Sequence, residues 1–215
     1  MVSVGQMGVW GVSSANALYY RTGTFRNQFS WGTTWQLIEG VIFKHISSGL
    51  NELVGIDVGD GIWRLASYSF NGQWILPVFE YYGDGLLKEV SVSGVSDQIW
   101  GINSVDDIFY KERVTDIGWT HIPGKLAHVE IGYLGVFGVT SDNKIFYRQN
   151  THQTTTGFGT EWQELGGLLA YITVGIDNAW GVNSLTDIFT LDNWWFNGGA
   201  LGAMAWTHMP GQLRS

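Results

Sequence analysis

Five copies of one sequence pattern fill the chain, and this repetition constrains the fold more than any other feature. The pattern Trp-Gly-Val/Ile, or a variant of it, opens "VWGVSSANALYYR" at Val9, "VGIDVGDGIWRL" at Val54, "IWGINSVDDIFYK" at Ile99, "VFGVTSDNKIFYR" at Val136 and "AWGVNSLTDIFTL" at Ala179. A marker tryptophan follows each copy, at Trp35, Trp74, Trp119, Trp162 and Trp206. The markers lie 39 to 45 residues apart, a period typical of propellers and related repeat folds.

Each copy divides into four short segments with strand character. An alternating stretch such as "KLAHVEIG" comes first, the Trp-Gly segment second, "IFYR" or its equivalent third, and the fourth begins at the marker tryptophan. Asn, Ser and Asp residues between the second and third segments, and Pro-Gly or Gly-Gly after the fourth, are typical of turns. We therefore predict an all-β fold in which residues 1–215 form a single β-propeller domain of five four-stranded blades.

The number of blades and the closure of the ring depend on two further stretches of the sequence. The stretch "PVFEYYGDG", between Trp74 and Leu87, matches no other repeat, so a cryptic sixth blade stays open. Joined end to end, "PGQLRS" and "MVSVG" read like "PGKLAHVEIG", which predicts that the termini meet at one blade seam.

Composition excludes several classes of function. A net charge of -8 without a basic cluster argues against nucleic acid as a partner. The sequence contains no run of about 18 apolar residues, so membrane insertion is not predicted. "MVSVGQMGVWGV" lacks the pattern of a signal peptide, and the chain contains no cysteine, so we expect a cytoplasmic protein, although a mature secreted protein has the same features.

The sequence offers no catalytic or metal-binding constellation. The absence of cysteine removes thiol nucleophiles and thiolate metal sites. His121 and His208 occupy the same slot, in "WTHIPG" and "WTHMPG", and the carboxylates occupy turns, where Asp commonly bonds its own backbone. We predict no enzyme, no cofactor and no metal. An enzyme that used the central channel would need one asymmetric acid or base cluster.

Aromatic residues are the candidates for binding, because like blades offer like sites whose weak contacts add through avidity. Trp10, Trp100 and Trp180 belong to the second segment, where packing between blades is expected. For the five marker tryptophans, burial in the core and contact with a ligand both stay open as interpretations. Other candidates lie in loops rich in Gly and Thr before the markers, either as a binding platform or as a lid over the blade edge: Trp31 in "WGTTW", Phe70 in "FNGQW", Phe158 in "FGTEW", and Trp194 and Trp195 in "NWWF".

The repeat "VSVG…WGVNSxDxIFYR…WxxIPGxL" resembles the tectonin repeat over the whole chain. This resemblance implies a β-propeller lectin with several sugar sites between neighbouring blades. The family's usual ring has six repeats of about 36 residues, whereas five of about 43 are counted here. The second repeat also departs from the pattern, with "VGID" in place of Trp-Gly-Val and Trp63 displaced into the next segment.

Carried over by position, the resemblance implies ligand contacts from the blade tryptophans and from polar residues in the adjoining turns. These turn residues are Asn16, Asn103, Asp106, Asp142 and Asn183. Asn and Asp can bond vicinal hydroxyl groups while an aromatic face contacts the apolar side of a pyranose.

The implied partners are glycans, including O-methylated mannose or fucose, on microbial or nematode surfaces, which would make the protein a defence agglutinin. A propeller that scaffolds a protein partner is the competing hypothesis. The sequence leaves open whether copies of the chain form a homo-oligomer.

Overall fold

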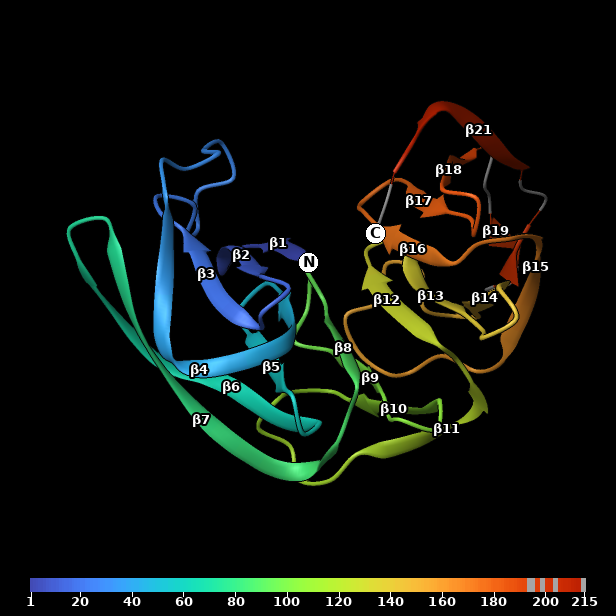
Figure 1. The fold of residues 1–215 in the computed structure, drawn as a ribbon. Coiled ribbons are helices and arrows are strands. Elements are labelled where there is room, and N and C mark those ends of the chain that lie inside the picture. The colour runs from blue at the N-terminus through green and yellow to red at the C-terminus, as the bar shows by residue number, and fades with distance from the viewer. Residues whose placement is uncertain (193–195, 198–199, 203–204, 214–215) are drawn as a thin grey trace.

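The computed structural model describes residues 1–192, 196–197, 200–202 and 205–213, and its main elements are five four-stranded antiparallel units arranged around a central channel (Figure 1). The first blade contains β1 (Val2–Gly5), β2 (Gly8–Val12), β3 (Ala17–Arg21) and the beginning of β4 (Trp35–Ser48). The second contains the end of β4 with β5 (Leu53–Asp57), β6 (Gly61–Asn71) and β7 (Trp74–Leu86). Because β4 serves both blades, β1 to β7 form one seven-stranded sheet.

The remaining three blades are separate sheets. The third contains β8 (Glu89–Val92), β9 (Ile99–Ile102), β10 (Asp107–Lys111) and β11 (Thr120–Lys125). The fourth contains β12 (His128–Gly132), β13 (Gly135–Val139), β14 (Lys144–Arg148) and β15 (Trp162–Leu168). The fifth contains β16 (Tyr171–Val174), β17 (Ala179–Val182), β18 (Asp187–Asp192) and β21 (Ala205–Gln212), and β19 (Phe196–Asn197) pairs with β20 (Ala200–Leu201). No helix in the described part of the chain is long and apolar enough to cross a membrane.

The predicted turn chemistry is confirmed. Asn16, Asp60, Asp106, Asn143 and Thr186 each close the turn between the second and third strands with a φ between 62° and 70°. Asn and Asp tolerate this left-handed conformation better than most residues, which explains their recurrence at this position.

The glycine that ends each outer strand causes a β-bulge. Gly124 has a φ of 125°, and the pairing of β10 with β11 shifts register between Asp107 and Ile108. The same shift occurs beside Gly167 and Gly211 in the fourth and fifth blades. Such a bulge bends the strand, and here it directs the chain from the outer edge of one blade towards the inner strand of the next.

The structure corrects the register of the second repeat. In the first blade, Trp35 lies opposite Arg21. The equivalent position in the second blade, opposite Leu65, is occupied by Phe79 and not by Trp74. Trp74 instead pairs with Asn71 at the tip of a hairpin formed by the extended β6 and β7. The stretch between Trp74 and Leu87 lies mostly in β7, so the alternative of a cryptic sixth blade in this stretch is excluded and the prediction of five blades holds.

The predicted seam between the first and last blades is open. Figure 1 shows these blades on either side of an opening in the ring, and among the described residues β1 pairs with β2 alone. Val2 and Val4 of β1 are 60% and 71% exposed, whereas Val90 and Val129 of β8 and β12 are buried. The chain therefore forms an arc of five blades in which the termini do not complete a shared blade.

Candidate functional site

Two of the boundaries between neighbouring blades have a groove beside the turn that joins the second and third strands. Between the third and fourth blades this inter-blade groove encloses about 100 Å³, and Gly124 and Lys125 line it from one side while Thr140, Phe146 and Trp162 line it from the other. Between the first and second blades a hollow of about 310 Å³ lies in the same place, lined by Gly40, Asp57 and Trp63 among others.

The glycine bulge is the reason that the groove exists. A Cβ atom on Gly124 would lie 3.3 Å from Cδ1 of Trp162, so the absence of a side chain lets the indole approach the bulge. The indole Nε1 of Trp162 donates a 3.1 Å hydrogen bond to the carbonyl of Pro123. Gly167 has the same relation to Trp206, whose Cδ1 would also lie 3.3 Å from an added Cβ.

A polar rim surrounds these aromatic side chains. In the third blade the ring of His121 lies 5.6 Å from that of Phe109, and in the fifth His208 lies 5.4 Å from Phe189. Lys125 lies 2.7 Å from the carboxylate of Asp107, and its hydrogen bond keeps the pKa of Asp107 below the usual value. The groove of Phe146 and Trp162 thus has the Lys125 ammonium and the Thr140 hydroxyl at its rim, whereas the two imidazoles lie beside third-strand rings at other boundaries.

The groove suits a sugar by its chemistry. A half-buried aromatic face offers an apolar surface for the C–H side of a pyranose, and the rim supplies donors and acceptors for its hydroxyl groups. Small pockets that combine apolar walls with a few polar groups are typical of ligand sites. The grooves at two boundaries provide two such places among the described residues.

The tryptophans of the second strand pack between blades as predicted, with one difference. Trp10 and Trp100 are fully buried, and Nε1 of Trp10 donates a 2.7 Å hydrogen bond to Met7. Trp180, at the open seam, is 36% exposed. Trp10 and Trp100 therefore cannot reach a ligand.

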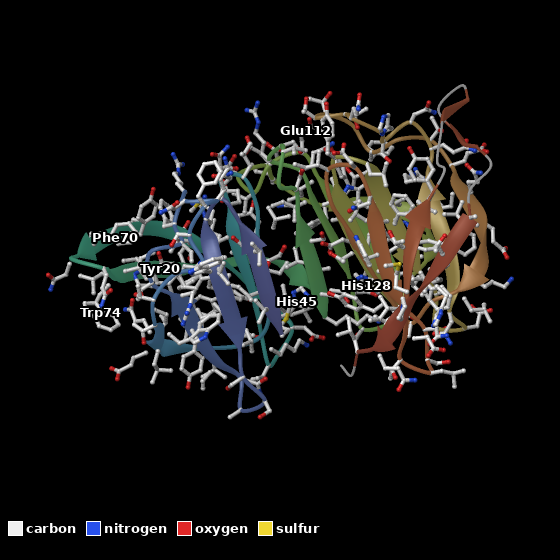
Figure 2. The ribbon with its side chains drawn as sticks, turned by 90° about the horizontal axis from the view of Figure 1, so that it is seen from above. Tyr20, His45, Phe70, Trp74, Glu112 and His128 are labelled. Carbon is white, nitrogen blue, oxygen red and sulfur yellow. The ribbon has the colours of Figure 1, made fainter. Side chains whose placement is uncertain are left out.

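The marker tryptophans divide into three groups. Trp119, Trp162 and Trp206 are half-buried, and each lies near a glycine of the preceding outer strand; Trp162 also lines a groove. Trp35 is 43% exposed because no blade precedes it. Trp74 lies at the hairpin tip, far from the grooves and from the centre of the ring (Figure 2).

Most polar turn residues serve their own turns. Oδ1 of Asn103 accepts hydrogen bonds from the amides of Val105 and Asp107, and Asn183 repeats this arrangement. Asp106 pairs with Lys88, Asp142 accepts a hydrogen bond from Thr140, and Asn16 adopts the left-handed turn conformation. None of these five predicted side chains is among the residues that line the two grooves.

Two of the predicted aromatic segments fold onto the preceding blade, although Phe70 lies in β6 and not in a loop as predicted. Phe158 lies 5.5 Å from Tyr110, and Phe70 lies 5.4 Å from Phe25, ring centre to ring centre. Both remain about two-fifths exposed, so each is a lid with one free face. Trp31 is 90% exposed. Trp194 and Trp195 lie outside the described residues.

The aromatic residue in the middle of each third strand was not predicted as a site residue from the sequence. These residues are Tyr19, Trp63, Phe109, Phe146 and Phe189, all half-buried. Phe146 and Trp63 line grooves directly. The signal was present in "LYYR", "IWRL" and "IFYR", since alternation along a strand places this ring on the face opposite that of Leu18 or Ile108.

A second missed feature is an acid–base cluster at the central channel, a cavity of about 340 Å³. Nδ1 of His128 lies 2.6 Å from the carboxylate of Glu89, its Nε2 lies 2.6 Å from the carbonyl of Ile172, and Tyr171 stacks on the imidazole at 4.0 Å. Figure 2 shows His45 and His128 near the middle of the ring. His45 and Glu130 line the cavity, and Nδ1 of His45 has no hydrogen-bond partner among the described residues.

Burial and ion pairing shift the pKa values of the groups in this cluster in opposite directions. Burial lowers the pKa of His128, but the carboxylate of Glu89 outweighs it and raises that pKa to about 9. Burial raises the pKa of Glu89, but His128 outweighs it and holds that pKa below its usual value. Burial raises the pKa of Glu130 to about 7 and lowers that of His45 to about 4.

These shifts predict a loss of stability at alkaline pH. The folded pKa of His128 exceeds its unfolded value of about 6.5, so its contribution is complete below pH 6.5 and disappears as the pH rises through 9. Urea unfolding at pH 6.5 and 9.5 should show a smaller free energy of unfolding at pH 9.5, and His128→Gln should reduce that difference. An identical alkaline loss in His128→Gln would contradict the assignment.

Comparison with known proteins places this geometry in a family. The tectonin domain family matches residues 1–165 and 84–215, and this domain is associated with lectin-like carbohydrate binding. Perivitellin-2 31 kDa subunit of Pomacea maculata is 51% identical over 35 residues, which are 16% of this chain and 12% of that protein's length.

Solved β-propellers share the fold at low identity. The chain aligns with yeast RCC1 (Prp20), in its complex with Kap60, at a TM-score of 0.57 and 11% identity, covering 88% of this chain and 55% of that one. Human WBSCR16 aligns at 0.62 and 10%, covering 96% and 66%. YCF48 bound to D1 peptide aligns at 0.56 and 12%, covering 96% and 65%. The chain thus spans a small part of the curated relative and about two thirds or less of these structures.

Proposed function

Since the chain belongs to the tectonin family, we propose that it is a multivalent lectin whose inter-blade grooves bind glycans. The observation that carries this proposal is the repeated pairing of a half-buried aromatic face with a polar rim, best formed by Phe146, Trp162 and Thr140. Several weak sites on one arc of blades favour repetitive glycans on a cell surface, because each further contact becomes intramolecular.

We propose further that these glycans are O-methylated sugars of microbial or nematode surfaces. A methyl ether removes a hydroxyl donor and adds an apolar group. A groove with apolar walls accepts that group at little cost, whereas the same walls would leave a hydroxyl group without a partner. This preference gives the protein a role in defence through agglutination.

A glycan array with O-methylated mannose and fucose beside the unmethylated parents tests the specificity. We expect binding to the methylated forms and agglutination of cells that is inhibited by the free sugar. Equal binding to both forms would contradict the proposed methyl preference. Silence across the array would contradict the lectin function and favour a protein partner held by the propeller.

Substitution of a groove residue tests the site itself. Phe146→Leu keeps apolar volume but removes the ring, so we expect about 2- to 10-fold weaker binding at that groove, the equivalent of an aromatic contact of about 0.5–1.5 kcal/mol. Leu76→Ala, on the exposed hairpin, is the matched control and should bind like the original chain. Unchanged affinity in a folded Phe146→Leu variant would show that the sugar binds elsewhere.

A further inference from the structure

The second blade carries a long hairpin, formed by β6 and β7. β6 has 11 residues, whereas the third strands of the other blades have 5 or 6. β5 pairs with Ile62, Trp63 and Arg64 alone, so from Leu65 onwards β6 pairs with β7 and with no other described strand. Figure 1 shows this hairpin on the outer side of the arc of blades, and Figure 2 shows Trp74 at its far end.

The inner face of the hairpin is fixed to the first blade. Ile75 is fully buried, and the side-chain amide of Gln36 donates a 2.7 Å hydrogen bond to its carbonyl and accepts a 2.9 Å hydrogen bond from its amide. The rings of Tyr68 and Phe70 lie 4.7 Å and 5.4 Å from that of Phe25. The hairpin is therefore a fixed projection, and its other face is directed outward.

The outer face carries an apolar row on β7, which we call the outer row: Trp74, Leu76 and Val78. These residues alternate with buried Ile75 along the strand, so they share the opposite face. Their side chains are 41%, 53% and 55% exposed. Their cross-strand partners on β6 are the polar residues Asn71, Ser69 and Ser67. The exposed face thus combines a continuous apolar row with a parallel polar row.

The hairpin also lacks charge. The sequence from Leu65 to Phe79, "LASYSFNGQWILPVF", contains no acidic or basic residue. Arg64 and Glu80 flank this stretch and pair with each other. Charged residues make up about a quarter of an ordinary soluble domain, so an exposed apolar face without any charge marks a binding surface. Binding at this face depends on the burial of apolar area and not on ion pairs.

Strand addition at the edge of β7 is blocked. Gln36 bonds both the amide and the carbonyl of Ile75, so these groups are not free for an added strand. Pro77, two residues further along the same edge, has no N–H to donate. Proline on an edge strand is a common means of preventing pairing with another chain.

A second copy of the chain would bury too little area on the outer row. Each of its three side chains exposes no more than about 100 Å², given that a whole aromatic side chain offers 150–250 Å² at about its maximum. A stable protein–protein interface needs about 800 Å² from each partner. A contact between copies through the outer row is therefore too small to persist.

We propose that the outer row binds the interfacial region of a lipid bilayer with neutral, zwitterionic headgroups. The ring of Trp74 suits this region, where an indole contacts acyl chains and its N–H meets water. Leu76 and Val78 contact the acyl boundary beside it, and the serine row faces the headgroups. A fluid bilayer needs no complementary shape, and the net charge of -8 disfavours anionic lipids.

The contact is shallow. From Leu65 onwards the outer edges of the hairpin pair with no described strand, so their backbone groups need water or headgroups as partners. The hairpin therefore stays at the surface and does not cross the hydrocarbon core. This contact lies apart from the grooves and acts without them, and on a cell surface it adds to weak sugar binding through avidity.

Flotation with phosphatidylcholine vesicles that carry no sugar tests the proposal separately from the lectin function. We expect the chain to float with the vesicles, and Trp74→Ser with Leu76→Ser to lower the partition coefficient at least about 10-fold. Val105→Ser with Ile117→Ser is the matched control, because it replaces two exposed apolar side chains of the third blade and should float like the original chain. Absence of flotation, or equal loss in both double variants, would overturn the proposal.

Ionic strength separates apolar binding from adsorption by charge. Flotation at about 1 M NaCl, where charges are screened beyond about 3 Å, should be as strong as at low salt. Vesicles that contain phosphatidylserine should bind the chain more weakly at low salt, because both carry negative charge. Binding that high salt abolishes would overturn the proposal.

A single fluorescent label locates the contact, since the chain has no cysteine of its own. Leu76→Cys labelled with an environment-sensitive fluorophore should shift its emission to shorter wavelength with phosphatidylcholine vesicles, while labelled Val105→Cys should not change. This readout does not depend on the folding of the double-serine variant. An unchanged label at position 76 would overturn the proposal. A shift that appears without vesicles as the protein concentration rises would also overturn it, because a second copy would then cover the outer row.

Discussion

Trp100→Ala should lower the free energy of unfolding by about 3–5 kcal/mol, the usual cost of removing a large ring from a packed core. Trp100 is fully buried, lies 5.3 Å from Tyr110 in its own blade, and reaches Trp162 of the next blade. Its removal leaves a cavity at the boundary, and neighbouring rings on two different sheets cannot easily collapse into it. Urea unfolding followed by circular dichroism measures the effect.

Trp180→Ala is the matched control for this prediction. Trp180 occupies the same position in the fifth blade but is 36% exposed, because no blade within the described residues packs on that side of the fifth blade. We expect a loss of about 1 kcal/mol, in proportion to the smaller buried area. Equal losses in the two variants would show that Trp180 is covered in solution.

Glu89→Gln should lower the free energy of unfolding by about 3 kcal/mol at pH 6.5, where His128 is charged. The two side chains are only 16% and 6% exposed, so the loss of the carboxylate leaves a buried imidazolium without its partner. Glu89 also accepts a 3.1 Å hydrogen bond from the amide of Val129, which ties β8 to β12. Chemical unfolding of the purified variant measures the loss.

Two further variants test whether the buried charge is the cause. Adding His128→Gln to Glu89→Gln should recover part of the stability, since no uncompensated charge remains. Glu164→Gln removes an exposed partner of Lys144 and should change stability by less than about 1 kcal/mol. A double variant no more stable than Glu89→Gln would contradict the electrostatic explanation.

Local patterns in the sequence predicted most of the blade architecture. Four strands, a left-handed Asn or Asp turn and a terminal glycine recur every 39 to 45 residues, and each of these depends on residues close together in the chain. The marker tryptophan of the second repeat was assigned to the wrong position, because β6 and β7 are longer than the equivalent strands of the other blades. Their tip displaces Trp74 from the position that Phe79 occupies, and only strand pairing shows the shift.

Contacts between blades were harder to predict, because they join residues about 40 positions apart. Glu89 and His128 belong to different repeats, and neither deviates from its local strand pattern. The groove was predicted only in part for the same reason. The marker tryptophans were identified as site candidates, whereas the third-strand aromatic residue that lines the groove was predicted to be part of a strand and not of a site. The exposure of Trp180 and Leu213 also follows from a neighbour that each lacks, which a local pattern does not encode.

The indole N–H signals of the tryptophans provide the most direct test of the central claim that the grooves bind sugar. Uniformly ¹⁵N-labelled protein is titrated with O-methylated mannose or fucose, and signals are assigned by single substitutions. The account predicts that Trp119, Trp162 and Trp206 shift together while buried Trp10 and Trp100 stay unchanged. Shifts confined to Trp31 or Trp74, or no shift with any sugar, would contradict it.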